Sequence, residues 1–292
     1  MISYSIKFIF FAAAMSLFIT SLNSGSNGNC YYIGNQSEAV LIDAGLSCRE
    51  TEKRLGLLGL SMDTVKAIFI SHEHTDHIKG VESIAEKYSL PVYITNATAQ
   101  RGRLHFKKQL IHFFIGYQAV KIGGLSITAF PKLHDAVDPH SFIIAGNGIT
   151  VGVFTDIGGC CNHVITHFSQ CHAAFLEANY DETMLEEGRY PVYLKNRIRG
   201  GKGHLSNSQA LEIFIKHRPS FMTHLLLAHL SKDNNDPQMA QQLFMDNANG
   251  IQVSVASRYG QTPVFVIQQH MQTPIDKQPV RVILRPQQLS LF

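Results

Sequence analysis

Short apolar runs separated by turn residues recur along the chain, from about residue 17 to residue 267. Eleven of these runs have the length and the content of Val, Ile, Leu and aromatic residues that are typical of β-strands, and several are followed by Gly, Asn or Asp. They cover residues 30–33, 39–43, 65–71, 91–95, 125–130, 140–145, 149–156, 173–178, 223–229, 251–257 and 263–267. Glycines at 123–124 and at 146–148 predict hairpin turns.

Helical segments are expected between these runs. The pattern predicts six helices, at residues 48–58, 77–88, 97–105, 162–169, 206–217 and 237–247. Ser47 and Glu50 have the spacing of a capping box before the first helix, and Pro237 opens the last one. Because hairpin strands and helices are mixed in both halves of the chain, we expect two sheets packed together with helices outside them.

Composition limits the class of protein and of partner. The chain has 292 residues, of which 45% are hydrophobic and 16% charged, enough for one large domain or two small ones. The net charge is only +3, so any attraction to an anionic partner must come from local patches. The five cysteines are odd in number and lack a CxxC pair, which favours reduced thiols in a cytoplasmic protein.

The N-terminal residues allow two interpretations. Lys7 precedes an apolar run that resembles a signal peptide, but the run is too short to span a bilayer as a helix. The alternative is that Met15 is the true start and that residues 16–22 form the first strand. We favour the second interpretation, since cleavage of a signal would remove that strand. Residues 1–14 are then a dispensable extension, and no membrane association is expected.

The C-terminal residues differ in character from the rest of the chain. After Ile267 the sequence is rich in Gln and Pro and has little periodicity. We therefore expect a folded domain over residues 15–268 and a flexible tail over residues 269–292.

Four side chains of metal-binding type follow the apolar run at residues 65–71. If His72 and His74 lie in extended chain, their side chains point the same way and hold one ion. Asp76 and His77, at the turn into the next helix, are displaced along the chain and serve a second ion. Two neighbouring ions are suited to hydrolytic displacement. A purely structural role is disfavoured, because burying so many unpaired polar groups is costly.

This HxHxDH motif resembles the signature of the metallo-β-lactamase superfamily. The resemblance implies a four-layer αββα sandwich and three further ligands, which match His134, Asp156 and His229 at the ends of predicted strands. It assigns His72, His74 and His134 to the first ion, Asp76, His77 and His229 to the second, and Asp156 to both as a bridge. Asp43 in LIDAG resembles the family's aspartate that braces the metal loop without being a ligand.

Nitrogen and oxygen ligands without a thiolate suit Zn²⁺ and also Mn²⁺. A water bridging two such ions has its pKa lowered toward neutrality and supplies the nucleophile, so no side-chain nucleophile is required. We therefore expect hydrolysis with two divalent metal ions as cofactors. Asp76, as a ligand, is expected to take part in catalysis.

Two segments suit a phosphate group. The loop SGSNGN at residues 24–29 offers close backbone approach at its glycines and donors from Ser26 and Asn29, although a hairpin turn explains it equally well. The second segment is basic and leads into His204 and Ser206. Its charges are Lys195, Arg197, Arg199 and Lys202. A solvated helix face is the alternative, but a phosphate backbone explains more easily why the charges lead into a Gly-flanked His.

A wider set of motifs resembles the WalJ/YycJ-type branch of the superfamily. The motifs are SGSNGNCYY, LIDAG, SHEHTDHIKG, HDAVDP, TDIGG, LEANYDETML, GHLSN and AHLSKDNN, which span roughly residues 20 to 240. The resemblance implies a DNA exonuclease that works from 5′ ends in repair or replication. It places His204 near the scissile phosphate, to clamp it or to protonate the leaving oxygen. Glu177, Asn179 and Asp181 either brace the site or form an ordinary polar strand end.

The last five residues, QLSLF, resemble the bacterial sliding-clamp-binding peptide. In this peptide Gln288 and Leu289 precede the pair Leu291 and Phe292, which enters an apolar groove. A flexible tether ending in such anchors would also raise the local concentration of the enzyme at DNA.

Two other functions remain as alternatives. A small-molecule hydrolase acting on a thioester or lactam is favoured if the apolar N-terminus is a secretion signal, but the lactamases with two metals usually place a Cys at the position of Asp156. A clamp-binding adaptor with a vestigial site is disfavoured by the complete ligand set. The sequence thus predicts a dinuclear-metal DNA exonuclease tethered to the clamp.

Overall fold

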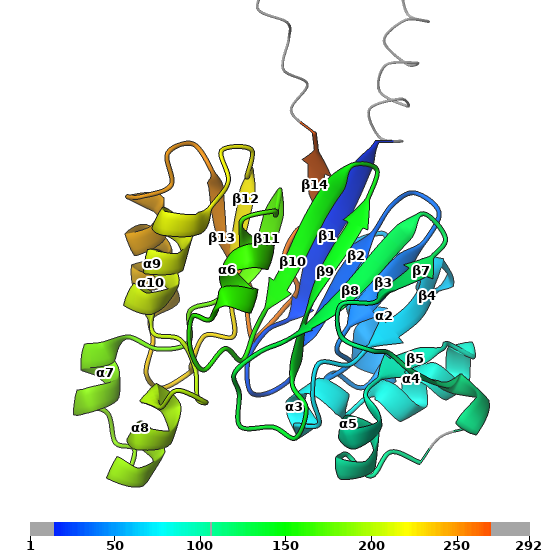
Figure 1. Ribbon diagram of the computed structural model, residues 1–292, viewed down its shortest axis with the longest axis horizontal. Coiled ribbons are helices and arrows are strands. Elements are labelled where there is room, and N and C mark those ends of the chain that lie inside the picture. The colour runs from blue at the N-terminus through cyan, green and yellow to red at the C-terminus, as the bar shows by residue number, and fades with distance from the viewer. Residues whose placement is uncertain (1–14, 106, 270–292) are drawn as a thin grey trace, which may run out of the picture.

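The computed structural model describes residues 15–105 and 107–269 (Figure 1). The predicted extension at residues 1–14 and the clamp-binding-like residues 288–292 lie outside the described residues. The structure therefore bears on the predicted domain and not on its two ends.

Seven strands form the first of two mixed sheets, in the order β14-β1-β2-β3-β4-β5-β6. Strands β14 and β1 to β3 pair antiparallel, whereas β3 to β6 pair parallel. Their bounds are β1 Ser16–Asn23, β2 Cys30–Gly34, β3 Ala39–Ile42, β4 Val65–Phe69, β5 Val92–Ile94, β6 Ile111–Phe113 and β14 Phe265–Gln268.

The second sheet also has seven strands, in the order β13-β12-β11-β10-β9-β8-β7. Strands β10 to β13 pair parallel, and β7 to β10 pair antiparallel. Their bounds are β7 Ala119–Ile122, β8 Leu125–Pro131, β9 His140–Gly146, β10 Ile149–Phe154, β11 Ala173–Glu177, β12 His224–Ala228 and β13 Gln252–Val255.

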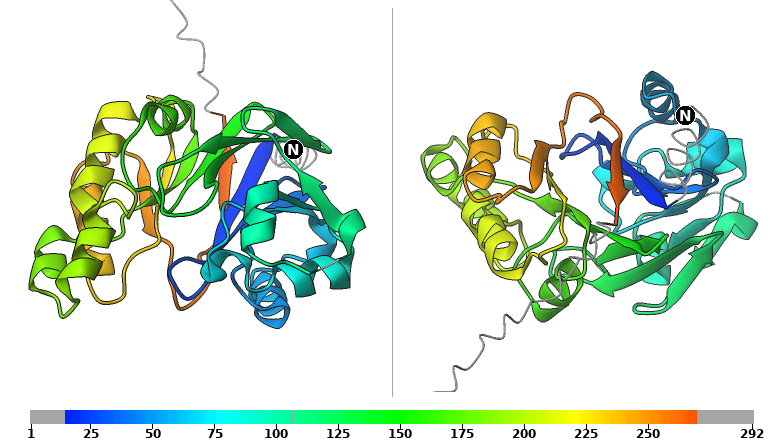
Figure 2. Two further views of the ribbon diagram at one scale, coloured as in Figure 1. Left: turned by 60° about the horizontal axis from the view of Figure 1, so that its bottom comes forward. Right: turned by 90° about the horizontal axis from the view of Figure 1, so that it is seen from above.

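Helices cover the outer faces of both sheets (Figure 2). Their bounds are α2 Cys48–Leu57, α3 Thr75–Ile78, α4 Val81–Tyr88, α5 Asn96–Arg101, α6 Asn162–Phe168, α7 Glu182–Glu187, α8 Val192–Arg199, α9 Asn207–His217 and α10 Pro237–Met245, with 3₁₀ turns η1 Met62–Thr64 and η2 Lys108–Leu110. None of the described helices is long and apolar enough to cross a membrane.

Three buried clusters hold the layers together. The central cluster lies between the sheets and joins residues such as Ile33 of β2 to Phe142 of β9 and Val153 of β10. A second cluster packs α6, α9 and α10 on one sheet, and a third packs α2 and α4 on the other. Burial of these apolar surfaces is the main stabilising contribution to the fold. The predicted four-layer αββα sandwich is confirmed.

The apolar runs were good predictors of strands. All eleven runs, and residues 16–22 before them, contain a strand of the structure. The two strands without a predicted run, β6 and β7, are edge strands of three and four residues whose side chains are largely exposed. Because their outer side needs no apolar partner, their sequences lack the buried pattern. The hairpin at residues 146–148 is confirmed, with positive φ at Asn147 and Gly148.

The prediction of one continuous helix at residues 77–88 is wrong, because two helices occupy this part of the chain. Helix α3 ends at Ile78 and α4 begins at Val81, because Gly80 leaves the helical pattern and donates its N–H to the carbonyl of Ala44. A Cβ at Gly80 would lie 1.7 Å from the carbonyl oxygen of Leu46. The hydrogen bond from Gly80 thus ties the end of α3, which carries Asp76 and His77, to the loop after β3.

Helices α7 and α8 were missed altogether. Both are short, and α8 has no buried residue, so neither shows an apolar stripe of helical period. The basic segment of the sequence is therefore a helix that lies beside the lower end of the second sheet (Figure 1).

Candidate metal centre and active site

The seven predicted metal ligands converge at one end of the sandwich. They come from the loop after β4 (His72 and His74), from α3 (Asp76 and His77), and from the segments after β8, β10 and β12 (His134, Asp156 and His229). Since the carboxyl ends of these strands meet at one edge, residues far apart in sequence become neighbours.

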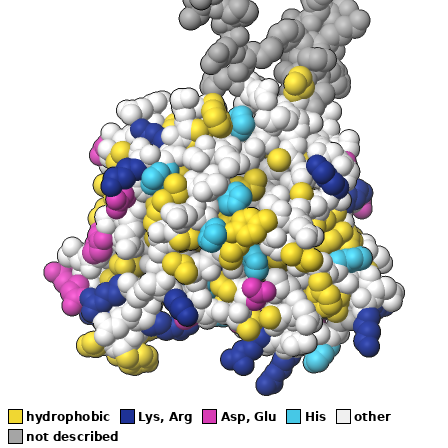
Figure 3. Space-filling model, viewed as in Figure 1, with side chains coloured by type: hydrophobic (Ala, Val, Ile, Leu, Met, Phe, Trp, Pro, Cys, Tyr) yellow, Lys and Arg dark blue, Asp and Glu magenta, His cyan; other side chains and the backbone are white. Residues whose placement is uncertain are grey.

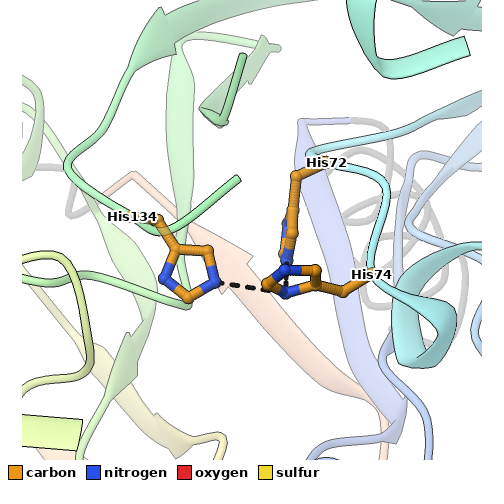
Figure 4. A group of neighbouring side chains, drawn as sticks. All are labelled: His72, His74 and His134. Atoms are coloured by element: carbon orange, nitrogen blue, oxygen red, sulfur yellow. Dashed lines mark hydrogen bonds between the residues drawn. The ribbon is translucent and has the colours of Figure 1, made fainter. Parts of the chain in front are cut away.

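Three histidines form the first group. Their rings point toward one another from separate segments of the chain (Figure 4). Nδ1 of His74 lies 3.0 Å from Nε2 of His72 and 3.4 Å from Nε2 of His134. These three nitrogens could share one metal ion.

The second group adjoins the first. Oδ2 of Asp76 lies 3.4 Å from Nε2 of His77 and 3.6 Å from Nε2 of His229. Asp156 lies between the groups, with Oδ2 3.2 Å from Nε2 of His77 and Oδ1 3.9 Å from Nε2 of His134. This position is the one expected of a bridging ligand.

The backbone at the strand ends is unusual. Asp43, Asp156 and His229 have φ of 61°, 54° and 55°, a left-handed conformation that costs a non-glycine residue about 1–3 kcal/mol. Each of the three follows a strand by one or two residues. The surrounding hydrogen bonds hold this conformation, which turns the side chains toward the ligand cluster.

Asp43 contacts the segment that carries the predicted ligands His72 and His77. Its carboxylate accepts hydrogen bonds from the backbone N–H of Ser71 at 2.8 Å and from the Ser71 hydroxyl at 2.9 Å. It also lies 2.7 Å from Nδ1 of His77. With Nδ1 engaged in this way, Nε2 of His77 is left to face Asp76 and Asp156.

Glu177 contacts histidine Nδ1 atoms on the opposite side of the site, as Asp43 does at His77. One carboxylate oxygen lies 3.0 Å from Nδ1 of His229 and 2.8 Å from Nδ1 of His204. The other accepts the backbone N–H groups of Ile157 and Leu205. Asn179 adds a hydrogen bond to the carbonyl of His229 at 2.7 Å. Asp181 serves elsewhere, since its side chain caps α7.

Two buried atoms indicate that the residues fit a metal. Within the described part of the chain, Oδ2 of Asp156 and Nε2 of His229 are buried and have no hydrogen-bond partner. Leaving such atoms unsatisfied costs free energy, and both lie where a cation would contact them. Imidazole nitrogens and carboxylate oxygens are the donors that Zn²⁺ and related divalent ions take.

The electrostatic balance of the site agrees with this assignment. Burial lowers the pKa of His134 to about 4, so this imidazole is neutral at pH 7 and its nitrogen is free to bind a metal. At His229 burial acts in the same direction, but Asp156, Asp76 and Glu177 outweigh it and raise the pKa to about 10. The carboxylates around His229 therefore stabilise positive charge at this position, and a bound divalent cation would supply such charge.

A cavity of about 430 Å³ opens over the two groups. Its walls include His74, Asp76, His134, Asp156, His204 and His229 together with Ser26, Tyr190 and Arg197. The His204 side chain is 21% exposed, so it can reach a substrate that lies in the cavity.

Only some of the predicted substrate-binding residues line the cavity. Ser26 and Arg197 line the cavity, and Arg197 pairs with Asp135 there at 2.6 Å. Lys195 and Arg199 bind Glu186 on the outside of α8. Lys202 is exposed and is not among the residues that line the cavity.

Two of the predicted substrate contacts need correction. Asn29 is fully buried, and its amide donates to Oδ2 of Asp76 at 3.0 Å, so it supports a ligand instead of touching substrate. Ser206 is also buried, caps α9 and donates to Glu182. Gly28 approaches closely as predicted, but the partner is the backbone at Gly45.

Sequence reasoning missed several residues around the ligand groups. Ser71 connects Asp43 to His72, with its hydroxyl 2.9 Å from Nδ1 of that histidine. Lys132 is buried, and its ammonium donates to the carbonyl of Thr155 at 2.7 Å, next in sequence to Asp156. Lys132 could have been found from the sequence, because it is a charged residue between an apolar strand and a predicted ligand histidine.

Comparison with known proteins identifies the class. A family model described as the beta-lactamase superfamily domain matches residues 38–229. The chain belongs to this superfamily, and its site is that of a metal-dependent hydrolase.

Two curated relatives align with most of the chain. Exodeoxyribonuclease YycJ of Bacillus anthracis is 34% identical over 232 residues, which cover 78% of this chain and 87% of the relative. Exodeoxyribonuclease WalJ of Streptococcus pneumoniae is 31% identical over 232 residues, with coverage of 77% and 86%.

Solved structures share the fold at low sequence identity. The metallo-beta-lactamase fold protein YhfI from Bacillus subtilis superposes with a TM-score of 0.66 at 17% identity, covering 86% of this chain and 99% of its own. Zn²⁺-bound PqqB from Methylobacterium extorquens superposes with a TM-score of 0.64 at 12% identity, covering 84% of this chain and 99% of its own. These similarities confirm the architecture.

Proposed function

We propose that this protein is a nuclease that hydrolyses phosphodiester bonds of DNA with two divalent metal ions, Zn²⁺ or Mn²⁺. The observation that carries the proposal is the pair of ligand groups joined through Asp156, with its unsatisfied oxygen buried between them. When bound, two such ions polarise the phosphoryl oxygen and activate a water for attack. The curated relatives named exodeoxyribonucleases support DNA as the substrate.

Within this function, His204 protonates the leaving oxygen. It lines the cavity beside the ligands, and its Nδ1 lies 2.8 Å from Oε1 of Glu177. Burial acts to raise the pKa of Glu177, but the neighbouring His204 and His229 outweigh it and lower the pKa to about 2. Glu177 is therefore a carboxylate at working pH, and it stabilises the positive charge that develops on the imidazole during proton transfer.

Exposed cations at the end of α5 and in the segment after it suit a DNA backbone. Arg101, Arg103, Lys107 and Lys108 are exposed, and none forms an ion pair within the described residues. Arg101 ends α5 and the other three follow it. Helix α5 lies beside α3, and Lys and Arg side chains gather along this lower edge of the molecule (Figure 3). The α8 cations Arg197 and Arg199, in contrast, are already paired with acids. Phosphates would therefore bind more favourably on the α5 side.

The finer parts of the proposal rest on the resemblance and on residues outside the structure. We propose degradation from 5′ ends, a role in repair or replication, and tethering to the sliding clamp by Leu289, Leu291 and Phe292. A cytoplasmic location is consistent with five free thiols.

The test is degradation of end-labelled duplex DNA, with matched RNA alongside, by the Mn²⁺- or Zn²⁺-loaded protein. We expect stepwise loss of DNA that depends on metal and is abolished in His74→Ala. Labels at the 5′ and 3′ ends separate the two polarities. If metal-loaded protein cleaves neither polymer, a small-molecule hydrolase becomes the better explanation of the site.

A further inference from the structure

A second cavity adjoins the catalytic one. It has a volume of about 260 Å³ and is lined mainly by the segment after β12, the end of β13 and the segment after β13, where Leu230, Val255 and Ala256 form an apolar wall. Ser231 lines both cavities, so the two share a wall. Ser24, also in this lining, accepts the backbone N–H of the metal ligand His229 at 2.7 Å.

Two cations and an aromatic ring surround the second cavity. Arg258 is partly buried, and its Nη1 is buried without a hydrogen-bond partner. Lys232 is exposed and, within the described residues, has no ion pair. The ring of Tyr259 lines the cavity and is 75% exposed. A guanidinium side chain that lines the cavity beside an accessible ring indicates a ligand with an anionic group and a flat apolar one.

The glycine loop of residues 24–29 holds this segment in place. The amide of Asn27 donates to the carbonyl of Arg258 at 2.8 Å, and the N–H of Ser24 donates to that of Ser257 at 3.1 Å. At Gly25, with φ of 145°, a Cβ would lie 3.3 Å from Cβ of Arg258. The loop therefore positions Arg258 beside the second cavity.

The acids near this cavity are already engaged. Asp233 accepts a hydrogen bond from the Tyr190 hydroxyl at 2.9 Å, and Asp236 caps α10. Tyr190 in turn lines the catalytic cavity. The charge of Arg258 opposes the rise in the pKa of Tyr190 that burial and Asp233 produce, which places the guanidinium near the boundary between the cavities.

We infer that this second cavity binds the nucleotide next to the scissile phosphate. The base stacks on Tyr259 against the apolar wall, and the nucleotide's other phosphate binds Arg258 and Lys232. The inference rests on the proposed nuclease function and adds to it a subsite for one nucleotide. Because stacking needs only a flat π face, this subsite accepts any base.

The probe is thymidine 3′,5′-bisphosphate, which carries a phosphate on either side of the sugar and so fits either polarity. It is compared with inorganic phosphate as an inhibitor of bis(p-nitrophenyl) phosphate hydrolysis by the metal-loaded full chain. We expect the bisphosphate to inhibit at a concentration at least about tenfold lower than phosphate does, since stacking contributes about that factor or more. Arg258→Ala and Tyr259→Ala should each weaken inhibition by the bisphosphate about tenfold and leave inhibition by phosphate unchanged.

Matched variants separate this effect from loss of folding. Tyr193→Ala removes another ring that is 75% exposed, on α8, and Arg49→Ala removes an exposed guanidinium on α2. The bisphosphate should inhibit both variants as strongly as the parent protein, and it should also inhibit Tyr259→Phe tightly because this variant keeps the stacking face. Equal inhibition of the parent and Tyr259→Ala by the bisphosphate overturns the subsite.

The proposed function can fail separately. If the protein degrades no DNA with either metal, the nuclease proposal falls and the subsite falls with it. If DNA is degraded but the bisphosphate inhibits no better than phosphate, the nuclease stands and the subsite alone is wrong.

Discussion

Glu177→Gln tests whether the carboxylate behind the metal ligands controls metal binding. The substitution keeps the shape of the side chain but replaces one acceptor oxygen with an NH₂ donor. In the native protein the carboxylate accepts from four donors, Nδ1 of His204 and of His229 and the N–H groups of Ile157 and Leu205. A glutamine can satisfy only the two donors that its remaining oxygen faces.

Either orientation of the amide has a cost. If the NH₂ faces Ile157 and Leu205, two buried backbone donors lose their acceptor, at about 1–3 kcal/mol each. If it faces the imidazoles, His229 must accept at Nδ1 and carry its proton on Nε2, the atom that faces the metal position. The second route preserves stability and weakens metal binding about 10- to 100-fold.

The assay is metal affinity by chelator competition, with the urea unfolding free energy measured on the metal-free protein. We expect Glu177→Gln to lose about 10- to 100-fold in affinity for at least one ion, or to lose about 2–6 kcal/mol of stability, whereas exposed Glu187→Gln changes neither. Unchanged affinity together with unchanged stability in Glu177→Gln would refute the role given to this carboxylate.

Three further predictions concern the frame around the site. Gly80→Ala should lower the unfolding free energy by about 1–3 kcal/mol or more, since its Cβ would meet the carbonyl of Leu46 at 1.7 Å. Gly56→Ala, in open space on α2, should instead raise it by about 0.5–1 kcal/mol in the same urea titration; destabilisation of both to the same extent would contradict the packing argument. Asp43→Asn should weaken metal binding about 10- to 100-fold in chelator competition because Nδ1 of His77 loses its anionic partner. An unchanged affinity would show that other contacts hold His77. Burial raises the pKa of Cys30 and Cys171, so iodoacetamide should label these thiols only on unfolding, while the exposed Cys160 reacts in the native protein; mass spectrometry showing early labelling of Cys30 would contradict the buried strand β2.

The sequence predicted best those features that buried strands require. Runs such as ITVGVFTD are apolar because both faces of β10 are covered, and the ligand that follows each run is forced to the shared sheet edge. Edge strands β6 and β7 and the exposed helix α8 lack that constraint, so their pattern is weak.

Which polar residues face the cavity and which are buried in support of the site could not be predicted in the same way. Ser26 and Asn29 stand in one loop, yet one lines the cavity and the other lies buried under Asp76. Which side chain reaches substrate depends on contacts with Asp76 and Gly45, which are distant in sequence. The role of Arg258 likewise appears only when the glycine loop is placed beside it.

The most direct test of the account is metal content and DNA hydrolysis measured together on the same samples, for the parent protein and for Asp156→Ala. The account predicts two divalent ions per chain and metal-dependent loss of DNA in the parent. In Asp156→Ala both the metal content and the hydrolysis should fall, because this carboxylate joins the two ligand groups. Full-rate DNA hydrolysis by Asp156→Ala, or by the parent protein after complete chelation, would contradict a metal-dependent nuclease site at these residues.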